Sequence, residues 1–235
     1  TEIAHRRILI DLHNPEQQAI VAAKTEGSHL VLAGPGSGKT KVIVHRVAWL
    51  LRECMVSPED IMVLSYNRSS AFEIRRRLWA LVGSDAAGVT VQTLHGMAMR
   101  LTGTSYAVAA ERGVSVDFSA VIKAATAQLK KAEIGDDLGA AIQRDRLLSG
   151  LRYLLVDEYQ DINAEHYDLI SALAGRSLSS DEDKLSLMVV GDDDQNIYTF
   201  GGANVKFIKQ FTTDYQAQSY YLIENYRSTT HIIHC

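Results

Sequence analysis

The stretch Ala33-Gly34-Pro35-Gly36-Ser37-Gly38-Lys39-Thr40 decides what kind of protein this chain can be. It fits the phosphate-binding loop that starts with Ala or Gly, continues with four residues and ends in Gly-Lys-Thr. Its glycines let backbone N–H groups turn inward around phosphate oxygens, and the helix N-terminus adds partial positive charge. In such a loop Lys39 reaches the β- and γ-phosphates, and the Thr40 hydroxyl ligates Mg²⁺.

The flanks of this loop have the pattern that the motif requires. The apolar run 29–32 predicts a strand before it, and apolar residues at helical spacing over 41–51 predict a helix after it. A glycine-rich turn that matches by chance is not expected between such elements. The sequence therefore predicts a nucleotide site here.

The composition is that of an ordinary water-soluble globular chain of one or two domains, with 235 residues and 22% charged residues. The net charge of −4 argues against a bulk polycation but allows a locally basic groove. No apolar run reaches the length of a membrane span, and residues 1–7 do not open a signal peptide. Only Cys54 and Cys235 are cysteines, which fits a reduced, cytoplasmic protein without a membrane partner. His231, His234 and Cys235 make only a weak case for zinc.

Further apolar runs predict strands at 61–65, 89–92, 152–156, 185–190 and 220–223. Each leads into polar residues at its carboxyl end, and in a parallel sheet these ends meet at one edge, where ligands bind. Asp157 and Glu158 follow one such strand. One carboxylate of this pair would hold Mg²⁺ and the next would polarise the water that attacks the γ-phosphate. Residues 102–150 are alanine-rich and helical in pattern, and they carry no phosphate or metal motif.

Several side chains have two interpretations on this evidence. A helix is predicted from Asn14 to near Gly27, in which Gln17 serves as a capping residue or as a ligand. The run 75–77 of arginines is ordinarily a solvated face, with Glu73 pairing Arg76 or Arg77. His95 is more often structural than functional, and Gln195 either senses a γ-phosphate or belongs to an acidic turn.

The motifs, taken in order, resemble those of the superfamily 1 DNA helicases of the UvrD/Rep/PcrA type over nearly the whole chain. Leu155-Val156-Asp157-Glu158-Tyr159-Gln160-Asp161 closely matches motif II, and Val190-Gly191-Asp192-Asp193-Asp194-Gln195-Asn196-Ile197-Tyr198 closely matches motif III. The other matching stretches are 14–17 (Q motif), 33–40 (motif I), 65–78 (motif Ia), 90–95 (the Thr-x-His motif) and 222–228 (motif IV).

This resemblance implies residue roles. Lys39, Glu158, Gln195 and Arg227 would be catalytic, and Thr40 and Asp157 would hold Mg²⁺. ATP would contact Gln17, Ala33, Gly34, Pro35, Gly36, Ser37, Gly38, Lys39, Thr40, Lys41, Tyr226 and Arg227, with Gln17 at the adenine edge and Tyr226 stacked on the base. Single-stranded DNA would contact Tyr66, Asn67, Arg68, Thr93, His95 and Phe200.

The resemblance implies a RecA-like P-loop NTPase domain of the α/β class, with a mostly parallel sheet and helices on both faces. The expected divisions are 1–101 and 151–235 for this domain and 102–150 for a small helical insertion, shorter than in the family's full helicases. In the family, motif III usually continues with Trp-Arg-Gly-Ala, whereas this chain has Phe200-Gly201-Gly202-Ala203, so Gly201 stands in place of an arginine. The sequence stops just after motif IV, so the family's second RecA-like domain is expected to be absent.

The function implied is Mg²⁺-dependent ATP hydrolysis, coupled in the full protein to 3′-to-5′ movement on single-stranded DNA, for example from a 3′-tailed duplex, as in DNA repair. A non-translocating regulatory nucleotide-binding module is the alternative. A phosphate-loop kinase is a third interpretation, which the motif III segment does not support.

Overall fold

The computed structural model of this protein describes residues 6–12, 14–105, 115–132, 137–148, 150–178, 180–192 and 206–224. Six strands form one parallel sheet in the order β3-β2-β4-β5-β1-β6. The strands, in chain order, are β1 Ser28–Ala33, β2 Ile61–Ser65, β3 Thr90–Thr93, β4 Tyr153–Val156, β5 Ser186–Gly191 and β6 Gln218–Leu222.

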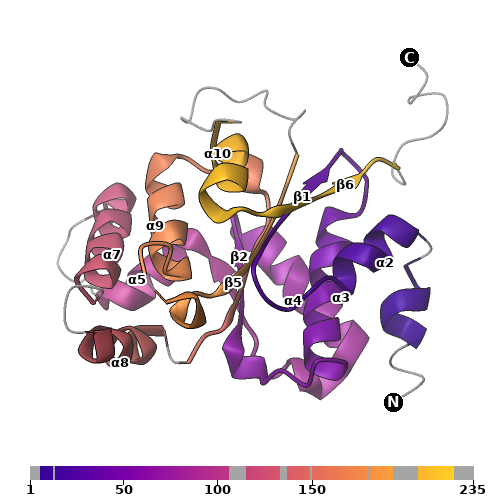
Figure 1. Cartoon of the computed structure of the whole chain (residues 1–235), viewed down its shortest axis with the longest axis horizontal. Coiled ribbons are helices and arrows are strands. Elements are labelled where there is room, and N and C mark those ends of the chain that lie inside the picture. Colours follow the sequence, from indigo (N-terminus) through magenta and orange to yellow (C-terminus); the bar gives the residue numbers. More distant parts are fainter. Residues whose placement is uncertain are drawn as a thin grey trace.

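Helices cover both faces of the sheet (Figure 1). One face carries α2 Pro15–Val21, α3 Lys39–Arg52 and α4 Arg68–Val82; the other carries α5 Leu94–Thr102, α7 Phe118–Ala132, α9 Ala164–Ala174 and α10 Lys206–Tyr215. The remaining elements are α8 Asp137–Leu148, a π-helical turn η1 Arg6–Ile10 and the 3₁₀ turns η2 Pro58–Asp60, η3 Gly83–Ala86, η4 Tyr159–Asp161 and η5 Asp181–Asp183. The predicted α/β class and mostly parallel sheet are confirmed.

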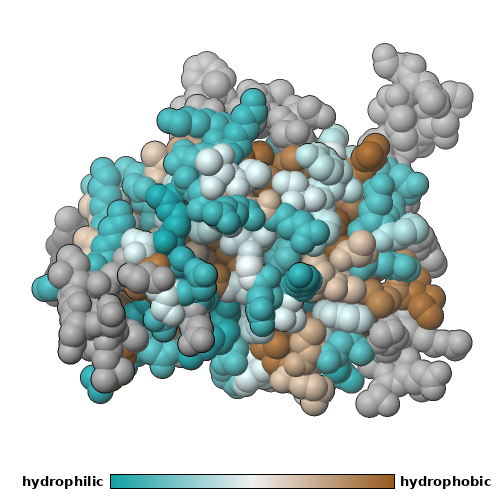
Figure 2. Space-filling model, viewed as in Figure 1, coloured by the Kyte–Doolittle hydropathy of each residue, from teal (hydrophilic) through white to brown (hydrophobic). Residues whose placement is uncertain are grey.

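The core is divided into two layers because side chains along a strand point alternately to opposite faces. In β5, Leu187 and Val189 pack with α9, whereas Met188 and Val190 pack with α3. Both layers are apolar, which explains why the buried strands read as continuous apolar runs. On the face seen in Figure 2, hydrophilic residues cover most of the surface and hydrophobic ones lie in separate groups.

The helix at Asn14 is shorter than the sequence predicts. It ends at Val21 and not near Gly27. The buried Arg46 of α3 donates to the carbonyl oxygens of Val21, Ala23 and Lys24, at 2.8, 2.6 and 2.6 Å. Those carbonyls are therefore satisfied from outside the helix, and the chain leaves the helical path there.

The segment 102–150 supplies α7 and α8, as its pattern indicates. Ile122, Ala125 and Leu129 of α7 are buried in the hydrophobic core on one face of the sheet, and α7 packs against α5 and α9. The division of the chain at 102 and 150 stays a prediction. No helix in the described ranges is long and apolar enough to cross a membrane.

Candidate functional site

The phosphate-loop sequence runs from the end of β1 into α3. Gly36 and Gly38 have φ angles of 77° and 90°, a backbone region that favours glycine. Gly38 is the N-cap of α3, and a Cβ atom there would lie 2.8 Å from Nε2 of Gln17. The Ser37 hydroxyl is buried and donates to the Gly34 carbonyl at 2.7 Å. The loop is thus closed on itself before any ligand binds.

Gln17 ties helix α2 to this loop. Its Nε2 donates to the Ser37 carbonyl at 2.8 Å, and its side chain is buried. The N-cap of α2 is Asn14, whose Oδ1 accepts from the backbone N–H groups of Glu16 and Gln17. The structure therefore places Gln17 against the loop, and its contact with adenine stays a prediction.

Lys39 lies between two acidic strand ends. Its Nζ is 3.2 Å from Oδ2 of Asp192, which follows β5, and 3.8 Å from Oε2 of Glu158, which follows β4. Asp192 is fully buried, and the Lys39 side chain is mostly buried. An ammonium held this way at a helix N-terminus is well placed to exchange a carboxylate for phosphate oxygens.

Asp157 is a buried carboxylate whose oxygens already have donors. Oδ1 accepts from the Glu158 backbone N–H at 2.9 Å, and Oδ2 accepts from the Ser70 hydroxyl at 3.2 Å. Burial is the main cause that raises the pKa of Asp157 to about 6, and the Glu158 charge adds to it. A divalent cation would favour the charged form of the Asp157 carboxyl group. Mg²⁺ is a hard cation that prefers oxygen ligands such as carboxylates, so the Asp157 carboxylate fits a magnesium site.

Glu158, two residues after the end of β4, has a left-handed backbone conformation, with φ of 53°. Its Oε2 accepts from Nε2 of Gln160 at 2.7 Å, and Oε1 of Gln160 accepts from the Asp192 backbone N–H at 3.1 Å. Gln160 thus joins the two acidic strand ends. Sequence reasoning did not single it out, although its position two residues after Glu158 was the available signal.

The other predicted nucleotide contacts fall into three groups. Thr40 lies in the first turn of α3, and Pro35 and Gly34 lie in the loop, beside Lys39. Lys41 turns elsewhere, since its Nζ donates to the Asp11 carbonyl at 2.6 Å. Gln195, Tyr226 and Arg227 lie outside the described residues.

Five of the six residues predicted to contact DNA lie together at the carboxyl ends of β2 and β3, namely Tyr66, Asn67, Arg68, Thr93 and His95. They line a pocket of about 260 Å³ whose walls are Tyr66, Asn67, Arg68, Thr93, His95, Gly96, Met99 and Phe118. Asn67 and Thr93 also have local roles, since their side chains are the N-caps of α4 and α5. Phe200 lies outside the described residues.

Aromatic rings form much of this pocket, called here the aromatic pocket. The His95 ring lies 4.9 Å from the Phe118 ring and 5.4 Å from the His166 ring, and Tyr66 lies 6.1 Å from His166. Burial, with a smaller effect from His95, lowers the pKa of His166 to about 4, and burial also lowers the pKa of His95. Both imidazoles are therefore neutral near pH 7, so neither adds charge to the pocket.

Sequence reasoning missed Phe118, which lines the pocket, and the buried His166, whose ring contacts those of His95 and Tyr66. Phe118 opens α7 in the segment without recognised motifs, and His166 lies on α9. Only the aromatic character of Phe118 at the start of a predicted helix was available as a signal, and it did not indicate what that ring would face.

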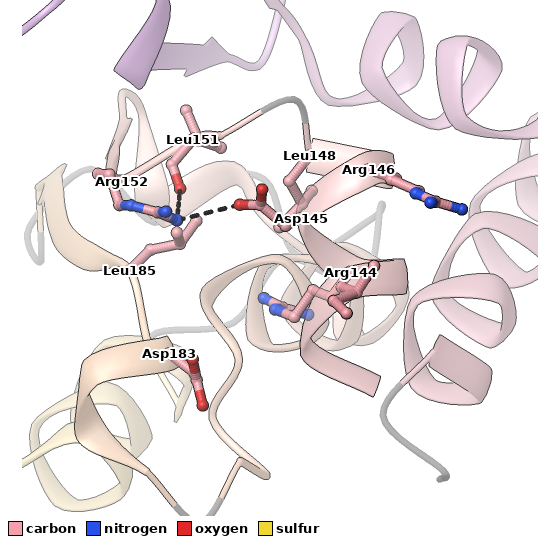
Figure 3. Close-up of a pocket in the computed structure, with 9 residues that line it drawn as sticks. Arg144, Asp145, Arg146, Leu148, Leu151, Arg152, Asp183 and Leu185 are labelled. Atoms are coloured by element: carbon pink, nitrogen blue, oxygen red, sulfur yellow. Dashed lines mark hydrogen bonds and ion pairs between the residues drawn. The ribbon is translucent and has the colours of Figure 1, made fainter. Parts of the chain in front are cut away.

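A larger pocket of about 460 Å³ lies at the opposite edge, where β4 and β5 begin (Figure 3). Two of its three arginines have partners among the described residues. Arg144 donates to the Ala172 and Leu173 carbonyls, and Arg152 donates to Asp145 at 3.3 Å. Figure 3 shows Arg146 pointing away from these residues. This pocket holds none of the predicted site residues.

Comparison with known proteins finds a matching family model and similar proteins. The model of the UvrD/REP helicase N-terminal domain matches residues 13–115 and 104–216. DNA helicase II of Salmonella typhimurium is 30% identical over 96% of this chain and 40% of that protein. ATP-dependent DNA helicase PcrA of Staphylococcus epidermidis is 30% identical over 96% of this chain and 39% of that protein. The crystal structure of Pif1 helicase from Candida albicans aligns with a TM-score of 0.48 and 16% identity, over 91% of this chain and 40% of that chain. The chain thus spans about 40% of the length of the curated relatives it matches.

Proposed function

The chain belongs to the UvrD/REP helicase N-terminal domain family, and we propose that it is the part of a longer DNA helicase that binds and hydrolyses Mg-ATP. The observation that carries the proposal is the convergence of Lys39 with Glu158 and Asp192 beside a preformed phosphate loop. Three strand ends, of β1, β4 and β5, meet there. This arrangement suits phosphoryl transfer, in which positioning and charge provide most of the catalysis.

In this proposal the chain's residues divide the work. Backbone N–H groups of 36–40 and Lys39 hold the phosphates, while Thr40 and Asp157 hold Mg²⁺. A bound Mg²⁺ supplies positive charge that neutralises the phosphate oxygens. Glu158 orients the attacking water and accepts its proton, and Gln160 keeps the Glu158 carboxylate facing the loop.

The remaining nucleotide contacts are proposed from the family resemblance. Gln17 reaches the adenine edge, and Tyr226 stacks on the base. Gln195 and Arg227 contact the γ-phosphate, and a further arginine comes from a second RecA-like domain across the cleft. An arginine supplied across such a cleft is worth about 10³–10⁵ in rate in related phosphoryl transfers.

The aromatic pocket is proposed as the contact with single-stranded DNA. Stacking on aromatic rings is tolerant of sequence and is worth roughly 1–3 kcal/mol per base. Neutral histidines suit this mode, because a base needs a ring face and not an ion pair. Movement in the 3′-to-5′ direction, starting from a 3′-tailed duplex, is part of the proposal. The family match does not favour the alternative of a regulatory module.

The test is ATP hydrolysis by the longer protein, with and without single-stranded DNA, for the wild type and for Glu158→Gln. We expect DNA to stimulate the wild type, and the variant to keep ATP affinity while losing about 10²–10⁴ of kcat. The 235-residue chain alone should bind Mg-ATP weakly, hydrolyse it very slowly and separate no strands. ATP binding without DNA-stimulated hydrolysis would favour the regulatory module, and equal loss of binding and turnover in Glu158→Gln would remove its proposed role. Strand separation by the chain alone, absent from Glu158→Gln, would show that it needs no second domain.

A further inference from the structure

Helix α4 exposes two large aromatic side chains on one side. Phe72 is 63% exposed and Trp79 is 58% exposed. They are seven residues apart, so they lie on the same side of the helix. The helix is held to the sheet by other residues, because Ala71, Ile74, Leu78 and Val82 are buried. Single exposed aromatics are ordinary, so the surface is judged here by the alignment of the two rings and by the charges that lie beside them.

Arginines alternate with these rings. Arg68 precedes Phe72 by four residues, and Arg75 lies between Phe72 and Trp79 on the same side of α4. The order along this side is therefore cation, ring, cation, ring over about 16 Å. We call Arg68, Phe72, Arg75 and Trp79 the α4 stripe.

The charge of α4 is opposite to that of the whole chain. The helix carries four arginines and one glutamate, on a chain with net charge −4. Glu73 is engaged off the stripe, since its carboxylate accepts from Arg76 at 2.8 and 2.9 Å and from Arg77 at 2.6 Å. Within the part of the chain that the structure describes, Arg75 has neither a hydrogen bond nor an ion pair. Its guanidinium is available to an anion.

The α4 stripe starts at the aromatic pocket. Arg68 belongs to both, and it lines the pocket together with Tyr66 and Asn67. A strand bound in the pocket that continues along α4 would meet Phe72, Arg75 and Trp79 in turn. The surface therefore offers rings for bases and guanidinium groups for phosphates, at successive positions along one path.

We propose that the α4 stripe extends the single-stranded DNA site beyond the aromatic pocket, with bases stacking on Phe72 and Trp79 and phosphates beside Arg75. This rests on the proposed function of the pocket. Stacking on exposed rings needs bases that are unstacked and unpaired, so a single strand fits the stripe and a duplex does not. Alternating arginines add cation–π and phosphate contacts that do not depend on sequence.

Fluorescence of Trp79 provides a direct test. The chain has two tryptophans, and Trp49 lies half-buried in α3, so Trp49→Phe leaves Trp79 as the only indole. This variant of the 235-residue chain is titrated at low salt with oligothymidylates of about 4 and about 16 nucleotides, lengths that bracket common single-strand site sizes. The longer strand should quench Trp79 emission, and the shorter strand should bind the pocket without quenching it.

Matched variants then locate the contact, with affinity measured by the anisotropy of labelled DNA. In the otherwise wild-type chain, Trp79→Ala and Phe72→Ala should each weaken binding of the longer strand about tenfold, with the shorter strand unaffected. In the Trp49→Phe background, Arg75→Ala should reduce the quenching, whereas Arg77→Ala, whose arginine pairs with Glu73, should not.

The outcomes separate this inference from the proposed function. If the shorter strand binds in a way that depends on Tyr66, but the longer strand leaves Trp79 emission unchanged, the proposed role of the α4 stripe is wrong and that of the pocket stands. Equal quenching by a blunt duplex would also overturn the proposed role of the α4 stripe. If Tyr66→Ala and His95→Ala leave binding of both strands unchanged, the proposed function of the pocket fails first.

Discussion

The phosphate-loop end of the sheet consists of backbone amides and charged side chains, whereas the aromatic pocket near β2 and β3 has the rings of Tyr66, His95 and Phe118 in its walls. Lys39 has two carboxylates within 4 Å, at 3.2 and 3.8 Å. His95, by contrast, has two rings within 6 Å and a pKa lowered by burial. The first end matches concentrated phosphate charge, and the second matches flat, uncharged bases. The difference shows how one sheet edge can hold two chemically distinct sites.

The two ends are joined by a short hydrogen-bonded path. Asn67, in the wall of the aromatic pocket, accepts from the Ser70 backbone N–H at 2.8 Å through its side chain. The Ser70 hydroxyl in turn donates to Asp157 at 3.2 Å. β4, which Asp157 follows, lies between β2 and β5 in the sheet. The difference between the two sites can therefore be tested by substitutions at the phosphate loop, in the aromatic pocket and at Ser70 between them.

The largest effect is expected at the charged end. Lys39→Ala in the longer protein should reduce kcat about 10²–10³-fold and weaken ATP binding, because a charge aimed at the phosphates is removed. Single-strand binding at the aromatic pocket should stay within twofold of the wild type, as measured by anisotropy. Because Lys39→Ala leaves the buried Asp192 without this ion-pair partner, thermal unfolding of the variant checks that the fold is not destabilised. A matching loss of DNA affinity without ATP would show that the two ends are not independent.

The aromatic end should respond to loss of one ring. Phe118→Ala should weaken single-strand binding about tenfold, since stacking is worth roughly 1–3 kcal/mol per base. Phe118→Tyr keeps the ring face and should bind as the wild type does, and ATP affinity should not change in either variant. Wild-type DNA affinity in Phe118→Ala would mean that α7 only shapes the pocket and does not contact bases.

The hydrogen-bonded path through Ser70 predicts that a change at Ser70 alters Mg²⁺ binding at Asp157. Ser70→Ala should raise about tenfold the Mg²⁺ concentration needed for half-maximal nucleotide binding, because hydrogen-bonding partners of metal ligands contribute to metal affinity. Ser70→Thr keeps the hydroxyl and should restore the wild-type value. Ser69→Ala is the matched control, since Ser69 is exposed on the adjacent position of α4. Equal values for the alanine variants would place Ser70 outside the metal site.

The smallest effect concerns the neutral rings. Burial and His95 hold the pKa of His166 at about 4, below its ordinary 6.5, while Glu165 acts in the opposite direction. As the pH falls, His166 is therefore protonated in the unfolded chain before it is protonated in the folded one. The stabilising contribution of the neutral ring is complete above the ordinary pKa of 6.5 and is lost as the pH decreases towards 4. Between pH 7 and 5.5 the expected loss is about 1 kcal/mol in the free energy of unfolding.

His166→Gln isolates that contribution. Glutamine does not titrate, and at this position it can still accept from the Asn163 backbone N–H, as the His166 ring does at 3.3 Å. Denaturant unfolding of the variant should show a flatter pH dependence over this range. An unchanged slope would assign the acid sensitivity to other groups and leave the neutrality of the pocket without this support.

Local patterns in the sequence predicted the positions of most strands and of several helices. The strands at 61–65 and 152–156 form as β2 and β4 to within one residue, because buried parallel strands are apolar on both faces. The helix beginning at Asn14 was overestimated, because its end depends on Arg46 from another helix. The helices α9 and α10 were not predicted.

By itself, the sequence determined the phosphate loop, the acidic strand ends and the family. Those features depend on residues close together in the chain, where glycine backbone freedom and strand-end positions follow from local order. Only the tertiary structure decided that Ser70 reaches Asp157, 87 positions away, and that Phe118 faces His95. Such contacts depend on the order of strands in the sheet and on where α7 packs, and no local pattern encodes either.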